Sequence, residues 1–96
     1  MSADIYRYGF RQGIPLDEVR YSLLLAALAA EGVHGQSEVR LDAGYHLDEK
    51  ERACVVDATT AVGKTISRIF TSLLTREFGE DAFSVERVDA VGEGCG

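Results

Sequence analysis

Six segments with regular hydrophobic patterns follow one another along the chain, and their order limits the fold more than any other feature. Four of them alternate apolar with polar residues or are rich in β-branched residues, as strands are, and two carry longer helical patterns. The predicted elements are strand 4–11, helix 15–31, strand 39–47, strand 52–58, helix 60–78 and strand 83–88. The order is therefore βαββαβ.

The alternation in the strands predicts which side of each strand is buried. Tyr6, Tyr8 and Phe10 share one side of the first strand. A tight turn centred on residues 49 and 50 would join the next two strands into a hairpin. In that register Tyr45 pairs with Cys54, Ala43 with Val56 and Leu41 with Ala58, and these six residues share the buried face.

Two helices of this length can cover one face of a four-stranded antiparallel sheet, which is the ferredoxin-like α+β sandwich. A chain of 96 residues fits one such domain. We expect a single domain over residues 1–90 and a flexible, glycine-rich tail over 91–96. This fold hosts many functions, so function must be argued from particular residues.

The charge and hydropathy exclude several classes of partner. The net charge of −6 repels phosphate backbones, so we expect no nucleic-acid binding. The longest apolar run covers the eight residues 23–30, too few to span a membrane, and the first residues lack the apolar stretch of a signal peptide. We expect a cytoplasmic protein, and eight arginines against two lysines indicate a GC-rich, bacterial genome.

The second half of helix 15–31, "LLLAALAA", is apolar on all sides, unlike a helix with one face in water. Alanine forms helices well and its exposure costs little, which is one explanation. The alternative is that Leu24, Leu25 and Leu28 form a second stripe that is buried against another chain. The sequence favours neither.

The uncovered face of the predicted sheet is a second candidate surface. With the aromatic residues of the first strand inward, the outward set contains Arg7, Arg11, Arg40, Asp42, His46, Val55 and Asp57. The opposite orientation would bury two arginines at several kcal/mol each. The outward face is either solvated, with ion pairs between the arginines and Asp57, or a contact surface for a partner or ligand.

The segment "DATTAVGKT", residues 57–65, ends like a phosphate-binding loop. That motif begins with glycine, and Ala58 stands there instead. The simpler interpretation is that Thr59 or Thr60 caps the following helix, with Gly63 and Lys64 on its solvent side. Thr59, Thr60 and Lys64 would then form at most a weak anion site at the helix N-terminus.

The histidines and cysteines do not predict a metal site, a cofactor or a catalytic residue. Neither His34 nor His46 lies at ligand spacing from a second histidine or a cysteine. We expect both histidines at the surface, Cys54 in the core and Cys95 exposed in the tail as a free thiol.

Two resemblances to known families concern the layout of the chain. In size and element order it resembles acylphosphatase, which has a basic phosphate loop after its first strand and an asparagine on its second. "FRQGIPLDEV" places Arg11 near that loop, whereas "SEVRLD" has Arg40 or Asp42 where the asparagine is expected. The layout is also similar to small amino-acid-sensing domains that pair through helices or strands, without a motif to carry over.

The sequence thus predicts a non-catalytic interaction or oligomerisation module, a homodimer or a partner of another protein. The alternatives are a small-ligand sensing domain with its site at a subunit interface and, third, a phosphate-directed hydrolase like acylphosphatase.

Overall fold

The computed structural model describes residues 4–89, which form one antiparallel sheet and a layer of helices. The elements are β1 (Asp4–Phe10), α1 (Leu16–His34), α2 (Gln36–Asp42), β2 (Tyr45–Asp48), β3 (Ala53–Asp57), α3 (Ala61–Phe78), the 3-10 helix η1 (Glu80–Ala82) and β4 (Phe83–Asp89). The four strands follow the order β2-β3-β1-β4 and every neighbouring pair is antiparallel. Residues 4–89 therefore form an α+β fold with a four-stranded antiparallel sheet and three α-helices.

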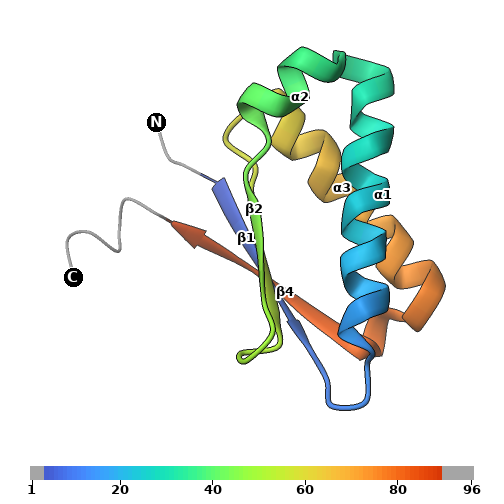
Figure 1. Cartoon of the computed structure of the whole chain (residues 1–96). Helices are drawn as coiled ribbons and strands as arrows, with labels where there is room; N and C mark the ends of the chain where they lie inside the picture. Colours follow the sequence, from blue (N-terminus) through green and yellow to red (C-terminus); the bar gives the residue numbers. More distant parts are fainter. Residues whose placement is uncertain (1–3, 90–96) are drawn as a thin grey trace.

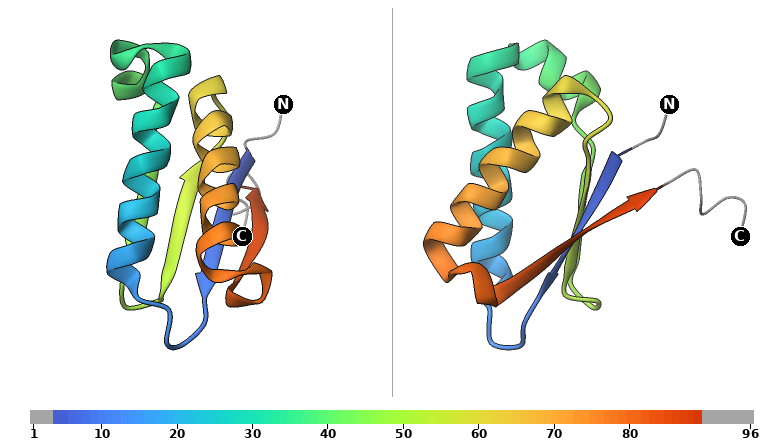
Figure 2. Two further views of the ribbon diagram at one scale, coloured as in Figure 1. Left: turned by 90° about the vertical axis from the view of Figure 1, so that its right-hand side faces the viewer. Right: turned by 180° about the vertical axis from the view of Figure 1, so that it is seen from behind.

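The helices α1 and α3 lie side by side on one face of the sheet, and α2 lies where α1 ends (Figures 1 and 2). None of the described helices covers the other face. The core fills the space between the two layers. Its largest fully enclosed side chains come from α1, α3 and the two central strands: Tyr8, Val19, Cys54, Val56, Val62, Ile66, Phe70 and Leu74.

The predictions for the first strand and the second long helix are confirmed. Tyr8 and Phe10 are buried on the helix side of β1, and Tyr6 packs against the same core. The hydroxyl of Thr60 accepts the Gly63 N–H at 3.0 Å, so Thr60 is the N-cap of α3. The helix ends at Gly79, whose φ of 88° is in the left-handed region that glycine adopts at little cost.

The first helix is longer than the sequence predicts. Gly32, expected just beyond its end, lies inside α1, which continues to His34. Gly35 ends the helix with φ 92°, and its N–H donates to the Glu31 carbonyl at 2.9 Å. A glycine within a helix lowers the helix stability by only about 1 kcal/mol, so α1 continues through Gly32 and ends at Gly35.

The prediction of a strand over residues 39–47 is wrong for its first half. Residues 36–42 form α2, and only 45–48 pair with β3. Val39 and Ala43, four residues apart, both face the core, while Leu41 is 84% exposed instead of buried. In so short a segment helical and alternating patterns coincide, and the helical spacing of Val39 and Ala43 prevails.

The hairpin register is also different from the prediction, by two residues. Asp48 and Ala53 pair with each other, and the turn consists of the four residues between them. Tyr45 therefore lies opposite Val56, and Leu47 lies opposite Cys54. The Asp48 carboxylate accepts the N–H groups of residues 50 and 51 at 3.1 and 3.2 Å and stabilises this longer turn. Because side chains alternate with a period of two, the shift leaves Cys54 and Val56 on the buried side.

Candidate functional site

The open face of the sheet brings together only part of the predicted outward set. His46, Val55 and Arg7 stand in one row across β2, β3 and β1, and Glu86 of β4 continues the row. Asp57 lies in the next row, opposite Ile5. The ion pairs of the described residues are Arg20 with Asp17 and Glu49, and Arg87 with Asp4, so the expected pair between an arginine and Asp57 does not form among them.

Arg11, Arg40 and Asp42 are not on this face, and the prediction is wrong for these three. Arg11 lies in the exposed loop after β1, whereas Arg40 and Asp42 belong to α2 at the other end of the sheet (Figure 1). The cause is the helix that replaces the first half of the predicted strand. The residues that the resemblance to acylphosphatase would bring together are therefore held at opposite ends of the molecule.

Leu24, Leu25 and Leu28 lie on the outer surface of α1, away from the core. With Tyr21 they form an apolar stripe at the spacing i, i+3, i+4 and i+7, referred to below as the α1 stripe. Tyr21 is 63% exposed, Leu24 51% and Leu28 61%. The excess of apolar residues in this helix predicts the three leucines, whereas Tyr21 lies outside the apolar run 23–30.

A shallow groove of about 240 Å³ adjoins this stripe where α1 meets the edge strand β2. Leu23 and Leu24 form its α1 side with Arg20, and Tyr45, His46 and Leu47 form its β2 side. Leu24 thus belongs to both the groove and the stripe, so the two make one continuous surface.

The carboxylate of Asp57 is engaged in the turn that precedes α3. Asp57 accepts the Thr59 N–H at 2.9 Å and the Thr59 hydroxyl at 2.6 Å. The expectation that Gly63 faces solvent is wrong, because Gly63 is buried and a Cβ there would lie 1.9 Å from the Asp57 carbonyl oxygen. Glycine is needed at this position for close packing of the helix on the end of β3. Of the residues of the predicted weak anion site, Thr59 is therefore bound to a carboxylate of the protein, Thr60 caps the helix and Lys64 is exposed.

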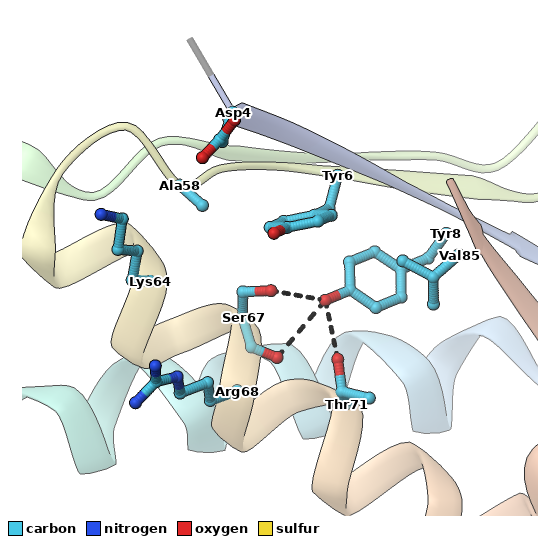
Figure 3. Close-up of a pocket in the computed structure, with 9 residues that line it drawn as sticks. All are labelled: Asp4, Tyr6, Tyr8, Ala58, Lys64, Ser67, Arg68, Thr71 and Val85. Atoms are coloured by element: carbon cyan, nitrogen blue, oxygen red, sulfur yellow. Dashed lines mark hydrogen bonds between the residues drawn. The ribbon is translucent and has the colours of Figure 1, made fainter. Parts of the chain in front are cut away.

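A larger hollow, of about 590 Å³, lies between α3 and the β1–β4 side of the sheet (Figure 3). Its polar lining groups include two cations of α3, Lys64 and Arg68, and the carboxylate of Asp4. Apolar surface comes from Tyr6, Ala58 and Val85. Of these residues only Lys64 was predicted as a site residue from the sequence. The spacing of Lys64 and Arg68, i and i+4 on one helix, was the signal that could have found the second cation.

The floor of the hollow is a buried hydrogen-bond network around Tyr8. The Tyr8 hydroxyl lies 2.8 Å from the hydroxyls of both Ser67 and Thr71. Its ring packs edge-on against Phe70 with centroids 4.9 Å apart. Burial raises the pKa of Tyr8 although the two hydroxyls partly oppose the shift. The network fixes the floor and satisfies its polar groups.

The predicted core position of Cys54 is confirmed, and burial raises the pKa of its thiol to about 12, which leaves it unreactive at neutral pH. His46 is exposed, but His34 is half-buried and its Nε2 lies 2.7 Å from the Thr65 hydroxyl, joining α1 to α3. Within residues 4–89 no three histidine, cysteine or acidic side chains are grouped closely enough to hold a metal. Cys95 lies outside the described residues.

In the described part of the chain, no helix has both the length and the apolar character needed to cross a membrane. Comparison of the chain with protein-family models, with curated protein sequences and with solved structures gives no match.

Proposed function

We propose that this protein is a non-catalytic interaction module that forms a homodimer through the outer surface of α1. The observation that carries this proposal is the exposed α1 stripe of Tyr21, Leu24, Leu25 and Leu28. Single exposed apolar residues are normal, but four at helical spacing form a contiguous patch, and such patches mark interaction surfaces.

The sheet topology fits the fold that the sequence predicts, and the fold leaves the outer side of α1 uncovered by the described residues (Figure 2). We infer a ferredoxin-like sandwich, because the strand order β2-β3-β1-β4 with antiparallel neighbours is the order that its βαββαβ connectivity produces. In this arrangement α1 presents its full length to a neighbour. The short helix α2 is an addition in the connection between α1 and β2.

A second copy of the chain fits the surface better than an unrelated partner. In a two-fold dimer the same patch meets itself, so a projecting side chain on one copy must find a depression on the other. The projecting Leu28 and the groove between α1 and β2 lie on one continuous surface, joined through Leu24. Antiparallel packing of two α1 helices would also place opposite ends of their dipoles together.

The size of the α1 stripe indicates how tightly the two copies should bind. A standard interface buries about 800 Å² per partner, so four side chains would form its centre and the β2 edge part of its rim. We expect a dissociation constant on the order of 10 μM, typical of a modest interface. Since each copy carries a net charge of −6, added salt should screen their repulsion and strengthen the dimer.

Sedimentation equilibrium tests the proposal. The double variant Leu24→Gln/Leu28→Gln should remain monomeric at concentrations where the unmodified protein is dimeric. Its circular dichroism should be unchanged, because neither leucine belongs to the core. Val85→Gln is a matched control, since Val85 is also exposed but lies on β4, away from α1.

Two results would overturn the proposal. One is an unmodified protein that is monomeric at high concentration. The other is a dimer that survives the double leucine substitution and dissociates on Arg7→Ala, which would place the interface on the open face of the sheet.

A further inference from the structure

The hollow beside α3 exists because β4 extends beyond the helical layer. Val85 lies opposite Tyr8 in the β1–β4 register and therefore points toward the helix side of the sheet. Tyr8 is fully buried there, yet Val85 is 43% exposed. Part of the helix-facing side of the sheet is therefore uncovered at β4. The hollow next to it has a volume of about 590 Å³, which is typical of small-molecule sites.

The charges around the hollow do not cancel. Lys64 and Arg68 project from the same face of α3, and no carboxylate of residues 4–88 lies within ion-pair distance of either cation. The acidic residue on the opposite wall, Asp4, is itself paired with Arg87 at 3.7 Å. The hollow is therefore locally cationic in a protein whose net charge is −6.

The remaining lining suits an apolar body more than a second charge. Figure 3 shows the Tyr6 ring along one wall, with its hydroxyl toward the end where Lys64 lies. Val85 and Ala58 add aliphatic surface. The hydroxyls of Ser67 and Thr71 are engaged with Tyr8, so they hold the floor in place instead of offering free donors.

We propose that this hollow binds a small organic monocarboxylate with an aromatic or branched aliphatic body. Lys64 and Arg68 hold the carboxylate, and Tyr6 and Val85 contact the body. A multiply charged phosphate fits less well, because the Asp4 carboxylate on the opposite wall would oppose its larger charge. A free amino acid gains nothing further, since Asp4 is already paired with Arg87.

Titration of the full chain with 3-phenylpropionate, followed by backbone amide NMR shifts, tests this site. The shifts should saturate with a dissociation constant of about 1 mM or below and should centre on residues 6, 67, 68 and 85. The alcohol 3-phenylpropanol, with the same body and no charge, should bind at least about five-fold more weakly. Added salt should weaken the binding.

Variants locate the charge that matters. Lys64→Gln and Arg68→Gln should each raise the dissociation constant about five-fold, and Val85→Asp should abolish saturation. Arg76→Gln is the control, because Arg76 is exposed on the same helix and does not line the hollow.

The proposal is overturned by shifts that do not saturate, by equal binding of the alcohol, or by an equal loss in Arg76→Gln. Tighter binding of phenylalanine or inorganic phosphate than of 3-phenylpropionate would also overturn it, since either would mean a different ligand class. The double leucine variant of α1 should bind 3-phenylpropionate normally, which separates this test from that of the dimer.

Discussion

The two long helices cover the same face of the sheet and differ by one residue in length, with 19 residues in α1 and 18 in α3. Their outer surfaces are nevertheless opposite in chemistry. The surface of α1 that faces away from the sheet carries Tyr21, Leu24 and Leu28, whereas the exposed residues of α3 include Lys64, Arg68 and Arg76.

This difference depends on how many apolar residues of each helix are buried in the core. In α3 the apolar residues form one stripe, and the core uses it: Val62, Ile66, Phe70 and Leu74 are all buried. In α1 the core buries Val19, Leu23, Ala26 and Ala30, and it leaves the side chains of Leu24, Leu25 and Leu28 exposed. An apolar surface left over after the core is complete points to contacts between molecules.

The largest expected difference in stability between the two helices comes from replacing one glycine in each with alanine. Gly63→Ala should destabilise the protein by more than about 3 kcal/mol, because its Cβ would lie 1.9 Å from a backbone oxygen that cannot move aside. Gly32→Ala in α1 meets no atom within 4 Å and should stabilise the protein by about 0.5–1 kcal/mol. Urea unfolding measures both, and equal midpoints would show that α3 does not pack this closely.

A smaller effect is expected from one leucine in each helix. Leu74→Ala should cost about 2–5 kcal/mol of unfolding free energy, since Leu74 is fully buried. Leu28→Ala should change the stability of the monomer by less than about 0.5 kcal/mol. Measurements below the dimer dissociation constant are needed, because subunit contacts would add to the cost of Leu28→Ala. A large loss there in the monomer would mean that Leu28 packs within its own chain.

Alkaline pH should destabilise the core on which both helices rest. The pKa of Cys54 is raised from 9.0 to about 12 in the folded protein, so the unfolded chain loses this proton first as the pH rises. Stability is therefore complete below pH 9 and falls above it, by up to about 1 kcal/mol between pH 9 and 10. Above pH 10 the raised pKa of Tyr8 adds to the loss.

The control for this alkaline effect is Cys54→Ala. Its unfolding free energy should be lower at pH 7 but flatter between pH 9 and 10 in chemical denaturation. An equal slope in the two proteins would mean that Cys54 does not cause the pH dependence.

The smallest effect concerns the polar contact that joins the two helices. The Thr65 hydroxyl donates to the Ala61 carbonyl at 3.1 Å, so it must accept from the Nε2–H of His34 at 2.7 Å. A double-mutant cycle with His34→Ala and Thr65→Val should give a coupling free energy of about 0.5–1.5 kcal/mol. Strictly additive effects would show that the contact contributes nothing to the packing of α1 on α3.

Much of the fold was predictable because strong local patterns agreed with the structure. The stripe of α3, its Thr60 cap and the inward aromatic residues of β1 all followed from spacing alone. The prediction for segment 36–48 was wrong because two patterns coincide there. Val39, Leu41 and Ala43 alternate as in a strand, and Val39 and Ala43 also have helical spacing. Over so few residues, contact with α1 and α3 decides between them.

The candidate sites divide in the same way. The leucines of the α1 stripe could be found because an excess of apolar residues is visible in a single segment. The hollow could not, because it joins Asp4 and Tyr6 of β1, Lys64 and Arg68 of α3 and Val85 of β4. No pattern within one segment connects residues so far apart.

By itself the sequence determined the order of the strands and long helices, the buried stripe of α3 and the polarity of the surface, because these depend on the period of side chains within one element. The tertiary structure decided the register of the hairpin, the burial of Gly63 against the end of β3 and the place where the sheet extends beyond its helices. These depend on distances between elements, which are set when the core packs and cannot be derived from any one segment.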